Sequence, residues 1–185
     1  MVAAPQPALP PEPAPQPSPA RQASVLAFPS ASEARVGFRR CNEAGLAIVR
    51  RSEGLYLRPY VCPAGFWTIG WGATRGLDGR PVTAQTPIIT QDQADQLLHR
   101  DLADSERAVA RLLPVPLTDN QYSALVDFTF NLGSGALQRS TLRQLILRAE
   151  HASVPAELTK WVRGGGRVLP GLVARRRAEG ALYAS

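Results

Sequence analysis

Residues 53–74 read EGLYLRPYVCPAGFWTIGWGAT, and the rest of the chain is organised around them. Glu53 ends a segment with helical apolar periodicity, and the residues after it are rich in glycine, proline and aromatic side chains, which favours a hairpin. Eight residues separate Glu53 from Cys62, and five separate Cys62 from Thr68. The stretch therefore brings an acid, a thiol and a hydroxyl group into one small region.

Glu53 is our candidate for a general acid. Hydrolysis of a glycosidic bond usually needs one group to protonate the leaving oxygen, and a second to activate water or to stabilise the oxocarbenium-like centre. The negative end of a helix dipole favours the neutral form of a carboxyl group placed beside it. Trp67 offers a flat face of the kind on which sugar rings pack. The alternative is a solvated Glu53 at a helix end, with the aromatic residues in the core.

Cys62 and Thr68 are the candidate partners of Glu53. Three roles are open for Cys62: it positions water, it acts as a partly ionised thiolate, or it serves as a redox switch. An ordinary thiol has a pKa of about 8.5, so a fourth interpretation is a small half-buried hydrophobic residue in a strand. Thr68 can hold water through its hydroxyl group, although its β-branched side chain also suits a strand.

The pattern E-x8-(D/C)-x5-T, the EG after the helix and the TIGWG turn resemble the phage-type lysozymes, the endolysins that cut peptidoglycan. Two later blocks are similar to the same family: QYSALVDFTFNLGSGAL at 121–137 and KWVRGGGRVLPGLVARRRAEGALY at 160–183. The resemblance covers roughly residues 42–183. It implies an α+β fold with two lobes, in which a long helix joins a small antiparallel sheet lobe to a mainly helical lobe, with a cleft between them.

The resemblance also implies a function. We expect a glycoside hydrolase, a muramidase that cleaves the β-1,4 bond between N-acetylmuramic acid and N-acetylglucosamine during host lysis. Glu53 would be the acid, Cys62 and Thr68 would govern the water, and no cofactor or metal is implied. This sequence departs from the family at Cys62, where many members have Asp, and at Ala73, where a His often follows the turn.

Two further positions are candidate substrate contacts. Asn131, before Gly133, matches a position that faces the cleft in relatives; the alternative is a helix-capping residue in the left-handed conformation. Arg175, in the run Arg175 to Arg177, is a candidate contact for acidic groups of the substrate, and the alternative is a solvated helix face.

Other functions remain open at this level. One is a peptidoglycan-binding module that has lost turnover through the change at Cys62, although Glu53 and Thr68 are retained. Another is a lytic transglycosylase, which uses one Glu and releases an anhydro sugar. The net charge of +6 suits any polyanion, but no nucleic-acid-binding motif accompanies it. We therefore expect peptidoglycan as the partner, no nucleic acid, and a monomer.

The chain divides into a tail and one domain. Residues 1–32 are rich in Ala, Pro, Gln and Ser, with nine prolines in the first 30 residues, so we expect a disordered tail there and a catalytic domain over 33–185. No signal peptide or stable membrane anchor is evident. We expect synthesis in the host cytoplasm and action in the periplasm or at the cell wall.

Local signals predict the secondary structure. Asn42 caps a helix that runs to about Ser52, and capping boxes open helices at Thr90 and Thr118. Further helices are expected over 141–149, near 155–162, and from Pro170 to the end, and strand-like segments at 60–61, 66–69 and 82–83. Cys41 and Cys62 flank the first helix, which separates them by about 15 Å, so we expect no disulfide between them.

Overall fold

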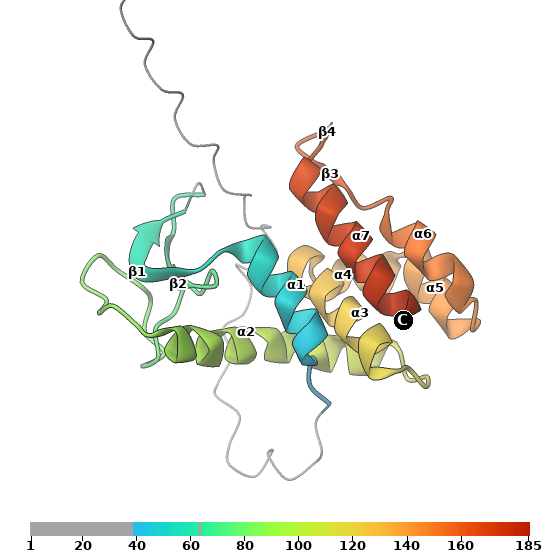
Figure 1. Ribbon diagram of the computed structural model, residues 1–185, viewed down its shortest axis with the longest axis horizontal. Coiled ribbons are helices and arrows are strands. Elements are labelled where there is room, and N and C mark those ends of the chain that lie inside the picture. The colour runs from blue at the N-terminus through green and yellow to red at the C-terminus, as the bar shows by residue number, and fades with distance from the viewer. Residues whose placement is uncertain (1–38, 63) are drawn as a thin grey trace, which may run out of the picture.

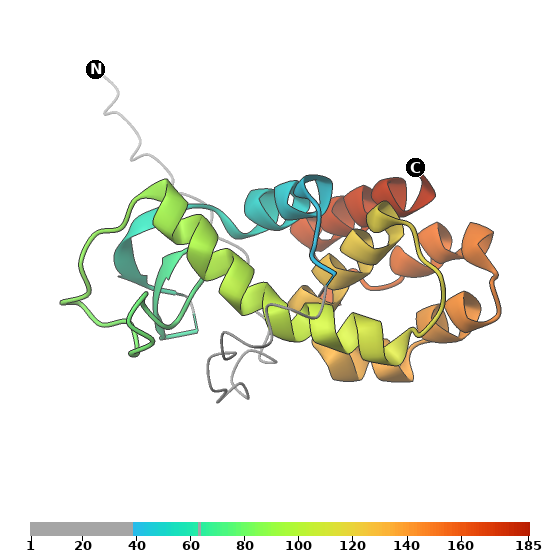
Figure 2. The same cartoon turned by 90° about the horizontal axis from the view of Figure 1, so that it is seen from below.

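The computed structural model describes residues 39–62 and 64–185 of the chain, and the predicted tail at 1–32 lies outside this range. A small lobe with a two-stranded sheet lies at one end of the molecule and a group of helices at the other (Figure 1). A long helix runs between them, as the view in Figure 2 shows. The predicted α+β architecture with two lobes is confirmed.

The first helix, α1 (Glu43–Glu53), ends at the candidate acid. The Asn42 side chain accepts a hydrogen bond from the Gly45 N–H at 3.0 Å and so caps the start of the helix, as predicted. Gly54 ends it, because its φ of 73° lies in the left-handed region that favours glycine. Glu53 is therefore fixed at the point where the chain leaves the helices and enters the sheet.

The small lobe contains β1 (Tyr56–Val61) and β2 (Trp67–Gly70), which pair antiparallel. The expected strand at 82–83 does not form. The Val82 N–H donates instead to the Thr74 carbonyl at 2.9 Å, within a loop whose only bridge there joins Arg75 and Pro81. A short extended segment becomes a strand only where a partner strand is available, and this one has a loop as its neighbour.

The connecting helix, α2 (Gln91–Leu112), belongs to both lobes. Its first turns contribute Ala94 and Leu97 to the core of the small lobe, which Ile69 and Val82 complete. Its later turns contribute to the core of the helical lobe. The predicted capping box of Thr90 and Gln93 is present at its start. One continuous amphipathic helix thus holds the two lobes together.

The helical lobe is built around α3 (Asp119–Leu132), where every residue from Tyr122 to Phe130 is buried. The predicted capping box of Thr118 and Gln121 begins it. The remaining elements are α4 (Ser134–Arg139), α5 (Thr141–Leu147), the 3-10 helix η3 (His151–Ser153), α6 (Val154–Leu158), β3 (Arg163–Gly164), β4 (Arg167–Val168) and α7 (Pro170–Ala184). The glycine-rich stretch before α7 therefore forms a short hairpin, and α7 begins at Pro170 as predicted.

The packing of α1 on α3 requires a residue without a side chain at position 45. A Cβ atom on Gly45 would lie 2.6 Å from Cys41 Sγ and 2.7 Å from Ser123 Cβ. Because both neighbours are buried, the two helices can approach this closely only with glycine there. This contact helps to fix α1, and therefore Glu53, against the helical lobe.

Over residues 39–62 and 64–185, every helix is either too short or too polar to cross a lipid bilayer. Cys41 and Cys62 are both free and both buried.

Candidate active site

Glu53 lies where α1 meets α7. Its side chain is 12% exposed, and its Oε1 accepts a hydrogen bond from Arg175 Nη1 at 3.1 Å. α1 packs directly on α7 as well as on α3. The candidate acid is therefore held at the junction between the lobes and keeps limited access to solvent.

Arg175 is buried and is shared between two carboxyl groups. Its Nε donates to Asp127 Oδ2 at 3.0 Å and its Nη2 donates to Asp127 Oδ1 at 2.7 Å, which is a bidentate pair. Its Nη1 is the nitrogen that reaches Glu53. Asp127 thus fixes the plane of the guanidinium group, and this plane aims the third nitrogen at the candidate acid.

The charges of this pair support one another. Burial opposes the charge of Arg175, but the nearby carboxylates, Asp127 first, raise the pKa of the guanidinium above its usual value. Burial also raises the pKa of Asp127, but Arg175, a hydrogen bond to Glu179 and the charge of Arg176 together lower it overall. Both groups are therefore ionised, and each is the counterion that makes the burial of the other tolerable.

Arg176 extends the same buried cluster on α7. It is fully buried and donates through Nη2 to Asn131 Oδ1 at 2.8 Å. The same nitrogen lies 2.8 Å from Glu179 Oε1, and the guanidinium group lies over the ring of Phe128, 5.1 Å from its centroid. The alternative of a solvated face is therefore wrong for Arg175 and Arg176, whereas Arg177 is exposed.

Asn131 lies within α3, and Gly133, with a φ of 85°, caps that helix. The alternative of a left-handed Asn131 cap is therefore wrong. The contact of Asn131 with substrate stays a prediction, and so does that of Arg175, whose Nε, Nη1 and Nη2 all donate to Asp127 or Glu53.

In the small lobe, the β1–β2 hairpin brings Cys62 and Thr68 together. The Cys62 N–H donates to the Phe66 carbonyl at 2.9 Å, and the Thr68 hydroxyl donates to the same carbonyl at 3.0 Å. Burial raises the pKa of the Cys62 thiol, but hydrogen bonds from the Phe66 backbone, the Thr68 side chain and the Ala64 backbone lower it overall. The hairpin therefore favours the thiolate more than water does.

The two tryptophans of the stretch have different surroundings. Trp67 pairs with Val61 across the strands and is 37% exposed, so its face is open to a ligand. Trp71 packs against the cores of both lobes and donates its indole N–H to Asp95 at 2.8 Å. Trp71 is therefore a structural residue of the lobe junction, and Trp67 remains the candidate for stacking on a sugar.

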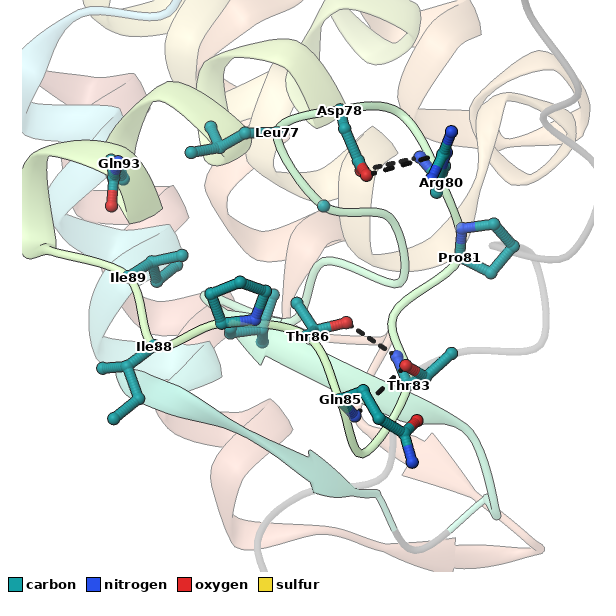
Figure 3. A pocket seen from close by; sticks show the side chains of 13 residues that line it. Leu77, Asp78, Arg80, Pro81, Thr83, Gln85, Thr86, Ile88, Ile89 and Gln93 are labelled. Atoms are coloured by element: carbon teal, nitrogen blue, oxygen red, sulfur yellow. Dashed lines mark hydrogen bonds and ion pairs between the residues drawn. The ribbon is translucent and has the colours of Figure 1, made fainter.

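A separate hollow of about 720 Å³ lies on the small lobe, between the turn at 76–80 and the segment 83–93 (Figure 3). Its lining includes Leu77, Ile88 and Ile89, with Asp78 and Arg80 paired at its edge. None of the predicted site residues lines this hollow. Among the described residues, no group of His, Cys, Asp and Glu side chains is arranged to hold a metal ion.

Together the fold and the site define a class: a two-lobe lysozyme-like protein with a carboxyl group at the lobe junction and a hairpin in the small lobe that contains Cys62 and Thr68. A family model described as phage lysozyme matches residues 50–179. The chain therefore belongs to the phage lysozyme family.

Individual relatives agree with this assignment. The endolysin of Acyrthosiphon pisum secondary endosymbiont phage 1 is 40% identical over 148 residues, which cover 78% of this chain and 97% of that one. Among solved structures, the endolysin from Escherichia coli O157:H7 phage FAHEc1 matches with a TM-score of 0.72 and 34% identity over 80% of this chain and 94% of that one. A mutant of P22 lysozyme matches with a TM-score of 0.73 and 32% identity, over 79% and 99%. Two Bacillus phage endolysins, from B103 and PZA, are longer, and this chain spans 53% and 55% of them.

Sequence reasoning missed Asp127 and Glu179. Both are fully buried, and both touch the cluster that contacts Glu53. One signal was available for Asp127, because it is the only charged residue in the apolar run ALVDFTF, and a charge on a buried helix requires a partner. For Glu179, the signal was its position three and four residues after two arginines on one helix.

Proposed function

We propose that this protein is a peptidoglycan-degrading glycoside hydrolase, a muramidase that cleaves the β-1,4 bond between N-acetylmuramic acid and N-acetylglucosamine during phage-type host lysis. One observation carries the proposal. Glu53, in the family's spacing to Cys62 and Thr68, lies partly exposed at the lobe junction and is oriented by Arg175. Membership of the phage lysozyme family supports it.

In the proposed reaction, Glu53 donates its proton to the glycosidic oxygen as the bond from that oxygen to C1 of the muramic acid breaks. Water adds to C1, and its proton leaves to a base, after which Glu53 regains a proton from solvent. Arg175 contributes at the moment of transfer, because its Nη1–H already points at Glu53 Oε1 and stabilises the carboxylate that forms. The same Arg175 hydrogen bond can therefore be made by Glu53 before and after it gives up its proton.

Cys62 and Thr68 are proposed to govern the water. A thiol whose pKa is lowered is more often ionised near neutral pH, and a thiolate accepts a hydrogen bond from water more strongly than a neutral thiol does. Thr68 lies beside the sulfur, and its hydroxyl group is proposed to turn from the Phe66 carbonyl to the thiolate when Cys62 ionises. Trp67 is proposed to stack on a sugar ring, and Asn131 and Arg175 to border the substrate.

The partner that we propose is therefore cell-wall peptidoglycan, bound by a monomer. We propose that the protein is made in the host cytoplasm and acts in the periplasm or at the cell wall. The net charge of +6 is consistent with attraction to a polyanionic wall.

The test is the identity of the products. Purified peptidoglycan is digested by the wild type, and the soluble fragments are separated and weighed. A muramidase releases fragments with a reducing N-acetylmuramic acid end, which contain one added water, whereas a lytic transglycosylase leaves an anhydro end. Glu53→Gln should abolish both, and Glu43→Gln, an exposed carboxylate at the start of the same helix, should not. Binding without any fragment release would show a recognition module and refute the proposal.

A further inference from the structure

Glu179 is a buried carboxyl group that the proposed reaction does not use. It lies in the middle of α7 with no exposed surface. Arg176 Nη2 forms an ion pair with its Oε1 at 2.8 Å, but among the described residues no N–H or hydroxyl group donates a hydrogen bond of good geometry to either oxygen. Its side chain lies within hydrogen-bonding reach of the Asp127 carboxyl group. Two ionised carboxylates that touch in a buried site repel each other strongly, whereas one shared proton turns the contact into a hydrogen bond.

The charge count of the cluster favours the shared proton in the state that follows proton transfer from Glu53. The charged groups that act on Glu179 are Asp127 from α3 and Arg175 and Arg176 from its own helix. Glu53 of α1 lies on the far side of Arg175, and α6 presents Pro155 beside Gly180. Once Glu53 has given up its proton, an ionised Glu179 would leave three carboxylates facing two guanidinium groups in a buried site. With a protonated Glu179, Asp127 and the Glu53 carboxylate balance Arg175 and Arg176 in that state.

We propose that Glu179 holds a proton that it donates to Asp127, and that this carboxyl pair positions Arg175 against Glu53. Asp127 and Glu179 are then positioning residues for the catalytic acid. The inference rests on the proposed function for its role in catalysis, but the protonation of Glu179 is a property of the folded protein alone.

The physical consequence concerns how readily Glu53 holds its proton. A lone guanidinium group 3.1 Å from Glu53 would favour the carboxylate and so oppose a general acid. Asp127 neutralises that guanidinium and occupies two of its nitrogens. Arg175 can therefore orient Glu53 through a hydrogen bond, while it favours the ionised form of Glu53 less strongly than an unpaired guanidinium group would. Burial and the nearby charge of Asp127 both raise the pKa of Glu179, which lies well above its ordinary value, as this arrangement requires.

The first test reads protonation directly and needs no activity. The side-chain carboxyl carbons of the full chain are titrated by ¹³C NMR, and Glu179→Gln identifies the Glu179 signal by its loss. We expect the chemical shift of a protonated carboxyl group for Glu179 at neutral pH. The shift of an ionised carboxylate there would overturn the proposal, whatever the protein does to peptidoglycan.

The second test reads positioning through the pH profile of peptidoglycan solubilisation. Glu179→Leu removes the donor to Asp127 and should lower kcat by about tenfold, and Glu179→Gln, which can still donate, should recover most of that loss. Asp127→Asn leaves Arg175 uncompensated and should move the alkaline limb of activity to lower pH. Glu157→Gln is the matched control, because Glu157 is a buried carboxylate of α6 paired with Lys160 outside the cluster.

Two results would contradict the positioning role: an unmoved alkaline limb in Asp127→Asn, or a Gln variant no more active than the Leu variant. A wild type that is inert on peptidoglycan would instead refute the proposed function. The NMR titration would still decide the state of Glu179 in that case, so the two failures are distinguishable.

Discussion

The two sides of Glu53 are held by different physical means. In the hairpin, the Cys62 N–H and the Thr68 hydroxyl group both donate to the Phe66 carbonyl of their own loop. On the α3–α7 side, Asp127 and Arg175 are buried charges fixed by one another. A local loop can change its side chains at little cost in stability, whereas a buried ion cluster cannot lose one member. Substitutions in the buried cluster should therefore lower stability, whereas substitutions in the hairpin should lower activity and leave stability nearly unchanged.

The largest effect should come from breaking the buried side. Arg175→Leu leaves Asp127 buried without its counterion, and such a loss costs about 3–5 kcal/mol in the free energy of unfolding. Urea denaturation measures it. Arg177→Leu is the matched control, because Arg177 is exposed on the same helix and should change stability by less than about 0.5 kcal/mol. Similar losses of unfolding free energy in both variants would show that the buried charge cluster does not contribute more to stability than an exposed arginine does.

The next largest effect should be on how the free energy of unfolding depends on pH. A protonated, buried Glu179 has a raised pKa, so the folded state keeps a proton that the unfolded state releases above about pH 4.3. Its contribution to stability is full at lower pH and is lost as the pH rises from there towards the raised pKa. The Gln side chain of Glu179→Gln does not titrate. The free energy of unfolding of this variant, relative to that of the wild type, should therefore increase by about 1.4 kcal/mol per pH unit within this window. Denaturation at a series of pH values would show a constant difference if Glu179 were ionised.

The hairpin side should show the opposite pattern, a loss of activity without a loss of stability. Cys62→Ser replaces a thiol of lowered pKa by a hydroxyl group, and kcat should fall at least about tenfold with the melting temperature nearly unchanged. Cys62→Asp should restore activity, because many members of the family have Asp here. Cys41→Ser is the control: Cys41 is equally buried, and burial raises its pKa to about 12. An active Cys62→Ser would show that the thiol is only structural.

The smallest effect should come from the exposed aromatic surface. Trp67→Ala removes a stacking face that is open to solvent, so KM should rise about threefold to tenfold while kcat changes little. Phe66→Ala, at a neighbouring exposed aromatic side chain, is a comparison on the same hairpin. Initial rates over a range of soluble peptidoglycan concentrations measure both constants. A change in kcat alone would remove Trp67 from the list of substrate contacts.

Local features of the fold could be predicted from the sequence, and the buried cluster could not. The Asn42 cap and the capping boxes at Thr90 and Thr118 depend on residues three positions apart, so the sequence shows them directly. Arg175 contacts Asp127 across 48 residues and Glu53 across 122. No local pattern specifies such a contact. The failed strand at 82–83 has the same origin, since pairing depends on what the rest of the fold places alongside.

The site shows the same division. The spacing of Glu53, Cys62 and Thr68 lies within one short stretch, and the structure places the last two in contact. That Arg175 is an internal partner of the acid follows only from the packing of α7 on α1 and α3. Two sequence signals point to such a cluster: a charged side chain inside an otherwise apolar helix, as at Asp127, and the spacing of Glu179 after two arginines.

The most direct test of the account is the rate at which Glu53→Gln releases soluble fragments from purified peptidoglycan, relative to the wild type. The Gln side chain keeps the shape of Glu53 and can still accept the Arg175 hydrogen bond, but it has no proton to donate. We expect a loss of about 10²–10⁴-fold in kcat, the range for removal of a general acid, with normal binding to the wall. A variant that keeps a tenth or more of the wild-type rate would show that another group protonates the leaving oxygen, and would contradict the account.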